Sequence, residues 1–269
     1  MFRRILVWAA CAGAVIVASA DTASAQIRRA GRSSGVGENY HVEASFSLWR
    51  PDTHIVVTSE SLGIPGTAID AVDDLGFENP TLPDFKVTLR ATPRFKLRFG
   101  YTPIKYTAQA TLERNIIFNG QLYSVGLPVD TELEWHAFRG GLQFDVVSVD
   151  RGFLGFIVEA KFTNFRMDLA SPLVSEFTDV KAPIPTVGGI GRVYVADNFA
   201  ITGELTGISL TIDEDEGRYF DFDLNGAYYF NRNVGAHFGY RRLSVHYGID
   251  LDTGDMKLGG IYFGAVGRF

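Results

Sequence analysis

The end of the chain carries the feature that most restricts the fold. In the last nine residues, Ile261–Phe269, an apolar or small residue occupies every second position back from Phe269, and Tyr262 and Arg268 lie between them. Successive side chains of a β-strand point to opposite faces. The segment therefore predicts a strand with one face that is compatible with lipid.

The first 25 residues are predicted to be a secretory signal peptide. A start with two arginines is followed by an apolar run at 5–20 and by an A-x-A cleavage site, Ala23-Ser24-Ala25. A retained transmembrane helix is the alternative, but the run is near the lower length limit for spanning. Cleavage would remove Cys11, the only cysteine, and residues 26–38 would form a flexible periplasmic lead-in.

The remaining residues, 39–269, contain ten segments that alternate between apolar and polar residues. Transmembrane strands have about nine to eleven such residues. The chain is also rich in glycine and phenylalanine and shows no long helical pattern. The ten predicted strands cover Tyr40–Trp49, Phe85–Ala91, Phe95–Thr102, Glu132–Val146, Leu154–Thr163, Val187–Val195, Phe199–Thr206, Phe220–Tyr228, Val234–Arg241 and Ile261–Phe269.

The connections between these segments alternate in length. Tight turns occur at 92–94, 148–152, 196–198 and 231–233, and the other five connections are longer, above all 50–84. Short periplasmic turns and long outer loops are typical of outer-membrane barrels. We therefore predict an all-β fold, a closed antiparallel transmembrane barrel of ten strands with both termini in the periplasm. Eight or twelve strands, and a soluble all-β sandwich, are the alternatives.

Two further patterns refine this prediction. Phenylalanines flank the tight turns and resemble an aromatic girdle at one membrane interface. The alternation of the fourth strand slips near Trp135, which a β-bulge would explain. The girdle residues are Phe95, Phe153, Phe199, Phe230 and Phe269.

Three segments resemble known outer-membrane proteins. The C-terminal strand resembles those of bacterial outer-membrane barrels, which end on an aromatic residue that the insertion machinery reads. Gly66–Phe77, GTAIDAVDDLGF, resembles the G-T-x-I-D-x-x-x-D-L-G-[LF] segment of a group of largely uncharacterised proteobacterial outer-membrane β-barrel proteins, as does 182–185 before the sixth strand. The resemblance implies localisation in the outer membrane, with Phe269 as assembly signal, and no established activity.

Charged side chains recur on the polar faces of the predicted strands, where they would line the lumen. Basic residues concentrate on the second and third strands and acidic residues on the seventh and eighth. They could pair with one another and plug the barrel, or line a narrow passage for small polar solutes. The candidates are Lys86, Arg90, Lys96, Arg98, Arg139, Asp145, Glu159, Lys161, Arg192, Glu204, Asp221, Asp223, His237 and Arg241.

Other functions depend on the outer loops. The long first loop could close the barrel mouth or stand up as the contact surface of an adhesin or receptor. A hydrolase at the rim would need clustered polar groups: His246 could approach Asp250 or Asp213, His54 lies in the first loop, and Ser244 shares a strand face with His246.

Charge and composition limit the partners. The formal net charge is −6, and nucleic-acid binding calls for clustered basic charge. We expect no cofactor, no metal and no catalytic site, and contacts with outer-membrane lipid, lipopolysaccharide and the insertion machinery. The predicted protein is a monomer and non-enzymatic, with a structural role or a narrow pore.

Overall fold

The computed structural model describes residues 36–58, 66–118, 120–171, 175–212, 215–249 and 252–269. The predicted signal peptide and residues 26–35 of the predicted lead-in lie outside the described residues. Within the described part, no helix is long and apolar enough to cross a membrane.

Ten long strands form the fold, and each pairs antiparallel with its neighbour in chain order. The sheet closes because β1 also pairs with β13, from Glu43 opposite Arg268 to Thr58 opposite Thr253. The all-β, ten-stranded closed barrel is therefore confirmed. The long strands are β1 (Val42–Thr58), β3 (Leu82–Arg90), β4 (Phe95–Thr111), β7 (Pro128–Val149), β8 (Gly152–Ala170), β9 (Ser175–Ala196), β10 (Phe199–Ile212), β11 (Asp215–Tyr229), β12 (Val234–Ile249) and β13 (Asp252–Arg268).

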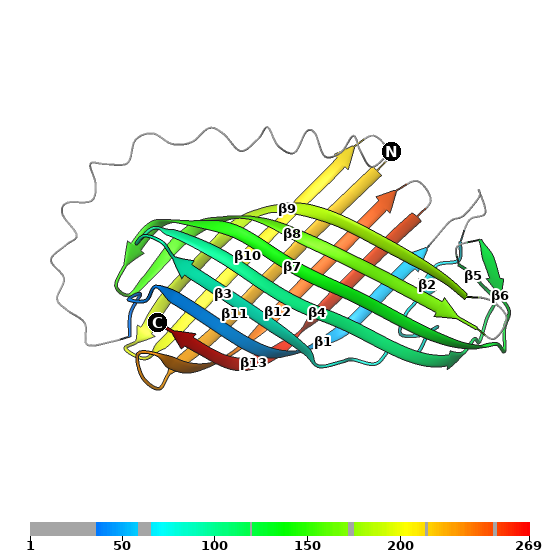
Figure 1. Cartoon of the computed structure of the whole chain (residues 1–269), viewed down its shortest axis with the longest axis horizontal. Coiled ribbons are helices and arrows are strands. Elements are labelled where there is room, and N and C mark those ends of the chain that lie inside the picture. Colours follow the sequence, from blue (N-terminus) through cyan, green and yellow to red (C-terminus); the bar gives the residue numbers. More distant parts are fainter. Residues whose placement is uncertain (1–35, 59–65, 119, 172–174, 213–214, 250–251) are drawn as a thin grey trace. The chain divides into compact units, whose positions relative to one another are not determined.

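The two ends of the barrel differ (Figure 1). The four tight turns, the start of β1 and the end of β13 share one end, which we call the terminal end. The opposite end, the loop end, carries three short strands: β2 (Ile69–Asp70) pairs with β1, and β5 (Ile116–Phe118) pairs with β6 (Gln121–Tyr123).

Most strands extend further toward the loop end than the alternation indicated. β8 and β9 pair as far as Ala170 opposite Ser175, and β12 and β13 as far as Ile249 opposite Asp252. Three of the five connections expected to be long, those after β8, β10 and β12, are therefore mostly strand. The long connections follow β1 and β4.

The predicted bulge near Trp135 is wrong. β7 stays in register with β8 from Asp130 to Asp145, and the register shifts only between Asp145 and Val147. Every second residue faces inward across this stretch, so what changes at Trp135 is the polarity of the inner face. Leu133 and Trp135 are buried and apolar, whereas Gln143 and Asp145 are buried and polar.

The same change of polarity divides the whole barrel into two zones. In the terminal-end zone, the outer face is an apolar belt that includes Phe156, Phe238 and Phe263, each 62–65% exposed, and the inner face carries the charges. In the loop-end zone, the inner face is apolar. There, buried side chains from the strands and the two long connections form one cluster, which we call the outer core. It includes Ile55, Ile69, Leu75, Phe77, Leu82, Ile104, Leu133, Trp135, Leu243 and Leu258.

The segment Gly66–Phe77 closes the loop end. Asp70 Oδ1 accepts hydrogen bonds from the backbone N–H groups of Val72 and Asp73, and Asp74 Oδ2 accepts one from Asp70. These bonds form a tight turn that ends at Gly76, whose φ of 72° favours glycine. Ile69, Leu75 and Phe77 are at most 3% exposed. The short motif noted in the sequence therefore builds the apolar plug of the barrel mouth.

Candidate functional site: the charged interior

Among the described residues, sixteen charged side chains form ion pairs inside the terminal-end zone. Eight are cationic and eight are carboxylates, and every cation lies within 4.0 Å of two carboxylates. The cations are Lys86, Lys96, Arg98, Arg139, Lys161, Arg192, Arg241 and Arg268, and the carboxylates are Glu38, Glu43, Asp84, Asp145, Glu159, Glu204, Asp221 and Asp223.

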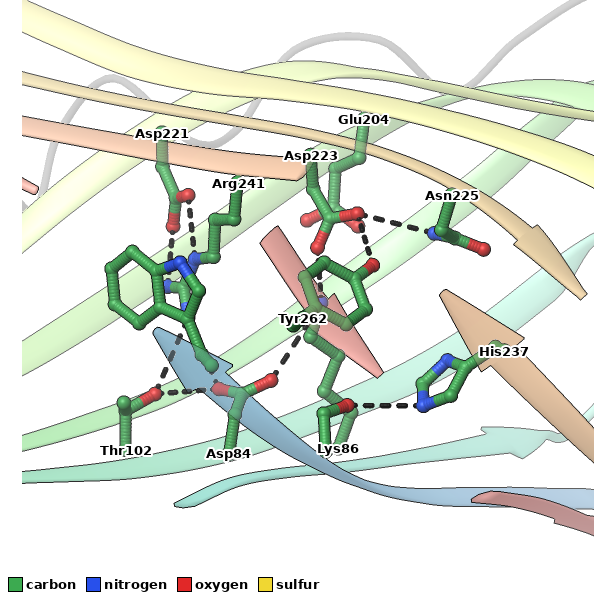
Figure 2. A network of polar contacts seen from close by, with 12 residues as sticks. Asp84, Lys86, Thr102, Glu204, Asp221, Asp223, Asn225, His237, Arg241 and Tyr262 are labelled. Carbon is green, nitrogen blue, oxygen red and sulfur yellow. Dashed lines mark hydrogen bonds and ion pairs between the residues drawn. The ribbon is translucent and has the colours of Figure 1, made fainter. Parts of the chain in front are cut away.

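The layer nearest the outer core centres on Asp221 and Arg241 (Figure 2). Arg241 donates to both carboxylate oxygens of Asp221, at 3.0 and 2.9 Å, and to Asp84 across the barrel at 3.0 Å. Lys161 donates to Asp221 at 2.9 Å. The guanidinium of Arg241 lies 5.0 Å from the ring centroid of Trp49, a buried member of the outer core, so this layer lies directly against the outer core.

Glycine makes room for these long side chains. A Cβ at Gly100 would collide with Arg139 Nε, which crosses over β4 toward Asp84. The small residue on one strand therefore lets a cation from the next strand lie across the lumen.

The middle layer joins the basic strands to the acidic ones. Lys86 on β3 donates to Asp223 on β11 at 2.5 Å, and Arg98 on β4 donates to Glu204 on β10 at 2.6 Å. Tyr262 donates to the second oxygen of Asp223 at 2.6 Å. The two ion pairs run across the barrel between walls that the sequence predicts to be opposite in charge. Figure 2 shows Lys86, Tyr262 and Asp223.

The basal layer contains residues that the sequence reasoning missed. Arg268 and Arg192 both pair with Glu43 and Glu38. Glu38 was assigned to the flexible lead-in, but its side chain is buried and its backbone N–H donates to Asp150. The prediction missed four members of the network: Glu38, Glu43, Asp84 and Arg268. Alternation alone places Glu43 and Arg268 on inward positions, so this pattern could have identified those two.

One aromatic residue lies on the opposite face from the prediction. Phe153, assigned to the outer girdle, is 6% exposed and points inward, with Lys96 Nζ 3.4 Å from its ring centroid. Alternation along β8 agrees with this inward direction, because Leu154 and Phe156 on the same strand are exposed. The girdle assignment was wrong because it used only the position of Phe153 beside a tight turn. Phe230 and Phe269 are exposed at the terminal end.

Twelve of the fourteen predicted lumen residues belong to the ion-pair network. His237 points into the lumen but does not belong to the ion-pair network. Its Nε2 lies 3.0 Å from Ser47 Oγ. Arg90 lies at the rim of the terminal end, where it donates to the Pro93 carbonyl. The space left between the basal and middle layers is a cavity of about 70 Å³, enough for about five waters.

The candidate rim histidines have acidic neighbours. His246 Nε2 lies 2.9 Å from Glu216 and its Nδ1 lies 3.4 Å from Asp255. No hydrogen bond joins Ser244 to His246 in the described part, and His54 approaches Asp70 at 3.9 Å. Asp213 and Asp250 lie outside the described residues. Nor do the described residues contain a group of three or more histidine, cysteine or acidic side chains that could hold a metal.

A pH-sensitive ion pair holds the segment Gly66–Phe77, which we call the plug segment. Hydrogen bonds from Arg114 lower the pKa of the Asp74 carboxyl from its usual value. A carboxyl with a lowered pKa stabilises the folded form above its unfolded pKa of about 3.9, and this contribution is lost as pH falls through the folded pKa. We therefore expect the Gly76 and Phe77 amides to exchange faster below pH 4. The lost protection should be about 1 kcal/mol or less, because Arg114 is half exposed and exposed ion pairs contribute little.

The matched control for this ion pair is the exposed Asp73 on the same turn. Arg114→Ala should abolish the acid-dependent loss of protection, and Asp73→Asn should retain it. An unchanged acid response in Arg114→Ala would contradict the assignment.

Comparisons with known proteins agree with the barrel. No protein-family model and no curated protein matches the sequence. Outer membrane protease OmpT from Escherichia coli aligns with a TM-score of 0.55 and 10% identity over 88% of this chain and 99% of that chain. Ail of Yersinia pestis aligns at 0.38, with 13% identity over 85% and 99%, and the outer membrane protein AlkL at 0.42, with 13% over 89% and 94%. The OmpT alignment supports a shared fold and carries no activity across.

Proposed function

We propose that this chain is an integral outer-membrane protein with a sealed lumen and a structural, non-enzymatic role. Its charged interior holds the wall together, and its loop-end zone projects from the membrane. A narrow pore for small polar solutes is the weaker interpretation.

The observation that carries this proposal is the double closure of the lumen. Among the described residues, eight cations and eight carboxylates pair within the terminal-end zone, around a small cavity of about 70 Å³ between two layers. Above them, Ile69 and Leu75 are completely buried in the outer core. An ion would have to break several buried pairs, each costly to leave incomplete, and then cross an apolar plug.

The apolar belt supports the location. Phe156 and Phe263 on the outer face are each 65% exposed, which water would disfavour and lipid would not. We propose that the terminal end faces the periplasm and that the loop end faces outward. The partners would be outer-membrane lipid, lipopolysaccharide and the insertion machinery, which would read Phe269, and the protein would be a monomer.

The belt can be tested by placing a charge in it. Phe156→Arg should lower the free energy of unfolding from phosphatidylcholine vesicles by about 2–4 kcal/mol, because arginine near the bilayer midplane is costly. Denaturant titration followed by tryptophan fluorescence would measure it. Asn164, exposed on the same face of the same strand but beyond the belt, is the matched control. If Asn164→Arg cost as much as Phe156→Arg, the belt would not be lipid-facing.

The sealed lumen can be tested with vesicles loaded with potassium. Refolded protein inserted into them should leave the rate of potassium release at the level of protein-free vesicles. Release that increases with the amount of inserted protein would favour the narrow pore instead.

A surface receptor or adhesin is the second candidate. It is favoured by the length of the strands beyond the belt: β7 and β8 continue in register to Asp130 and Ala170 with alternating polar outer residues. This extension would present a rigid, folded surface outside the membrane.

A further inference from the structure

The barrel wall has a gap at the loop end, between β1 and β4. β3 lies between these two strands, but its pairing with β4 stops at Phe85 opposite Tyr101. Asp84 and Thr102 come next and are joined through their side chains. One step further, Pro83 faces Pro103, and neither proline has a backbone N–H to continue the ladder. β4 nevertheless runs on to Thr111 and β1 to Thr58.

The edge of β1 at this gap is covered. Val56 and Val57 pair with β2, and Ala71 N–H donates to the Ile55 carbonyl at 2.9 Å. Thr53 N–H donates to the side chain of Asn79 at 3.0 Å. The plug segment and Asn79 just after it thus satisfy the backbone groups that β3 leaves free on this side.

The facing edge of β4 lacks backbone hydrogen bonds to the described residues, although Gly76 lies close to Gln109 and Ala110. Leu112 N–H donates to the Leu127 carbonyl on the β7 side, and successive residues of a strand direct their backbone groups to alternate edges. Residues 106, 108 and 110 therefore bond to β7. Lys105, Thr107, Gln109 and Thr111 face the gap, where no backbone partner reaches them from the described part of the chain.

An open groove of about 810 Å³ runs along this free edge. Gly76 of the plug segment and residues 78–80 just after it line the groove, together with β4 and the loop-end parts of β7 and β8. Thr131, which is 3% exposed, contributes a hydroxyl that has no hydrogen-bond partner. The groove therefore offers unsatisfied hydrogen-bonding groups beside an accessible space.

The charges of the groove select the ligand. Glu78, Asp130, Glu132 and Asp168 line it. Among the described residues, Lys105 is the one cation that lines it, and Lys105 already donates to Glu132 and Glu134 at 2.6 and 2.8 Å. Glu132 pairs with Lys105 and Asp168 with Arg166, so the net negative charge of the lining comes from Glu78 and Asp130.

We propose that this groove binds an extended cationic peptide segment, which pairs with residues 105–111 as an additional strand. Addition of a strand to a free sheet edge supplies main-chain hydrogen bonds, and side-chain contacts give specificity. Basic side chains of the ligand would lie against the acidic lining. The site goes beyond the structural role proposed above and does not depend on whether the lumen is sealed.

The test uses refolded wild-type protein in detergent and a fluorescent octapeptide of alternating lysine and valine. Fluorescence anisotropy should show saturable binding, which the same peptide with glutamate in place of lysine lacks. Two further peptides carry N-methyl groups on all lysines or on all valines. Because only one set of N–H groups faces β4, one methylated peptide should bind like the parent and the other at least tenfold more weakly.

A variant tests the edge from the side of the protein. Thr107→Pro removes an N–H that faces the gap and leaves the ladder with β7 intact, since proline is tolerated on free edges. It should weaken binding at least tenfold, whereas Thr107→Ala should leave it unchanged. Equal binding by the glutamate peptide, equal loss with both methylated peptides, or no binding would overturn the proposal. Self-association of the protein that Thr107→Pro abolishes, without peptide binding, would assign the edge to a second copy instead.

Discussion

Asp221→Asn is expected to lower the free energy of unfolding by about 3–5 kcal/mol, because it leaves buried charges without a partner. Three cations, Arg139, Lys161 and Arg241, lie within 3.8 Å of this one carboxylate. Asparagine keeps the size of the side chain and removes the charge. The loss therefore reports electrostatic pairing rather than a packing defect, and denaturant titration in vesicles would measure it.

Asp168 provides the matched control outside the network. It forms a two-bond pair with Arg166 at 2.8 Å on the exposed face of β8. Exposed pairs contribute about 0.2–1 kcal/mol, so Asp168→Asn should have a much smaller effect. Similar losses in the two variants would show that the interior charges are hydrated and independent, as in an open pore.

Leu75→Asp is expected to release the plug segment from the outer core. Leu75 is completely buried among apolar side chains, and an unpaired carboxylate there costs several kcal/mol. We expect proteolytic cleavage within 66–81 and faster exchange of the Gly76 and Phe77 amides. The ladder between β1 and β13 should stay intact, because its register extends through the terminal-end zone.

Asp73→Ala is the control for that variant. The residue lies on the same turn but is exposed, so protease resistance should match the wild type. If Leu75→Asp unfolded the whole barrel along with the plug, the two zones would be one cooperative unit, contrary to this expectation.

Alternation predicted the strands well where lipid and lumen impose opposite polarity. It ended them too early where both sides change, as at Trp49 in β1, which continues to Thr58. Beyond Trp49 the outer face becomes polar and the inner face apolar. Ser47 and Ile55 therefore both point inward, although one is polar and the other apolar. A change of polarity along one strand therefore looks, in the sequence, like a shift in the phase of the alternation.

The candidate site was predictable in its inward positions but not in its pairing. The opposite charges of β3–β4 and β10–β11 were evident, yet only the closed barrel shows that Lys86 reaches Asp223 and that Arg98 reaches Glu204. Glu38 was not predicted as a lumen residue because it precedes the first strand. Its burial depends on Arg192 and Arg268, which are far away in sequence.

Single-channel recording in planar bilayers tests the central claim, a sealed lumen, most directly. Inserted wild-type protein should show no discrete conductance, because the paired charges and the outer core block the path. Arg98→Gln and Asp223→Asn alter the charges of the middle layer and leave the plug in place, so they should also be silent. Discrete steps in the wild type that change in size with either substitution would establish a pore lined by these residues and contradict the account.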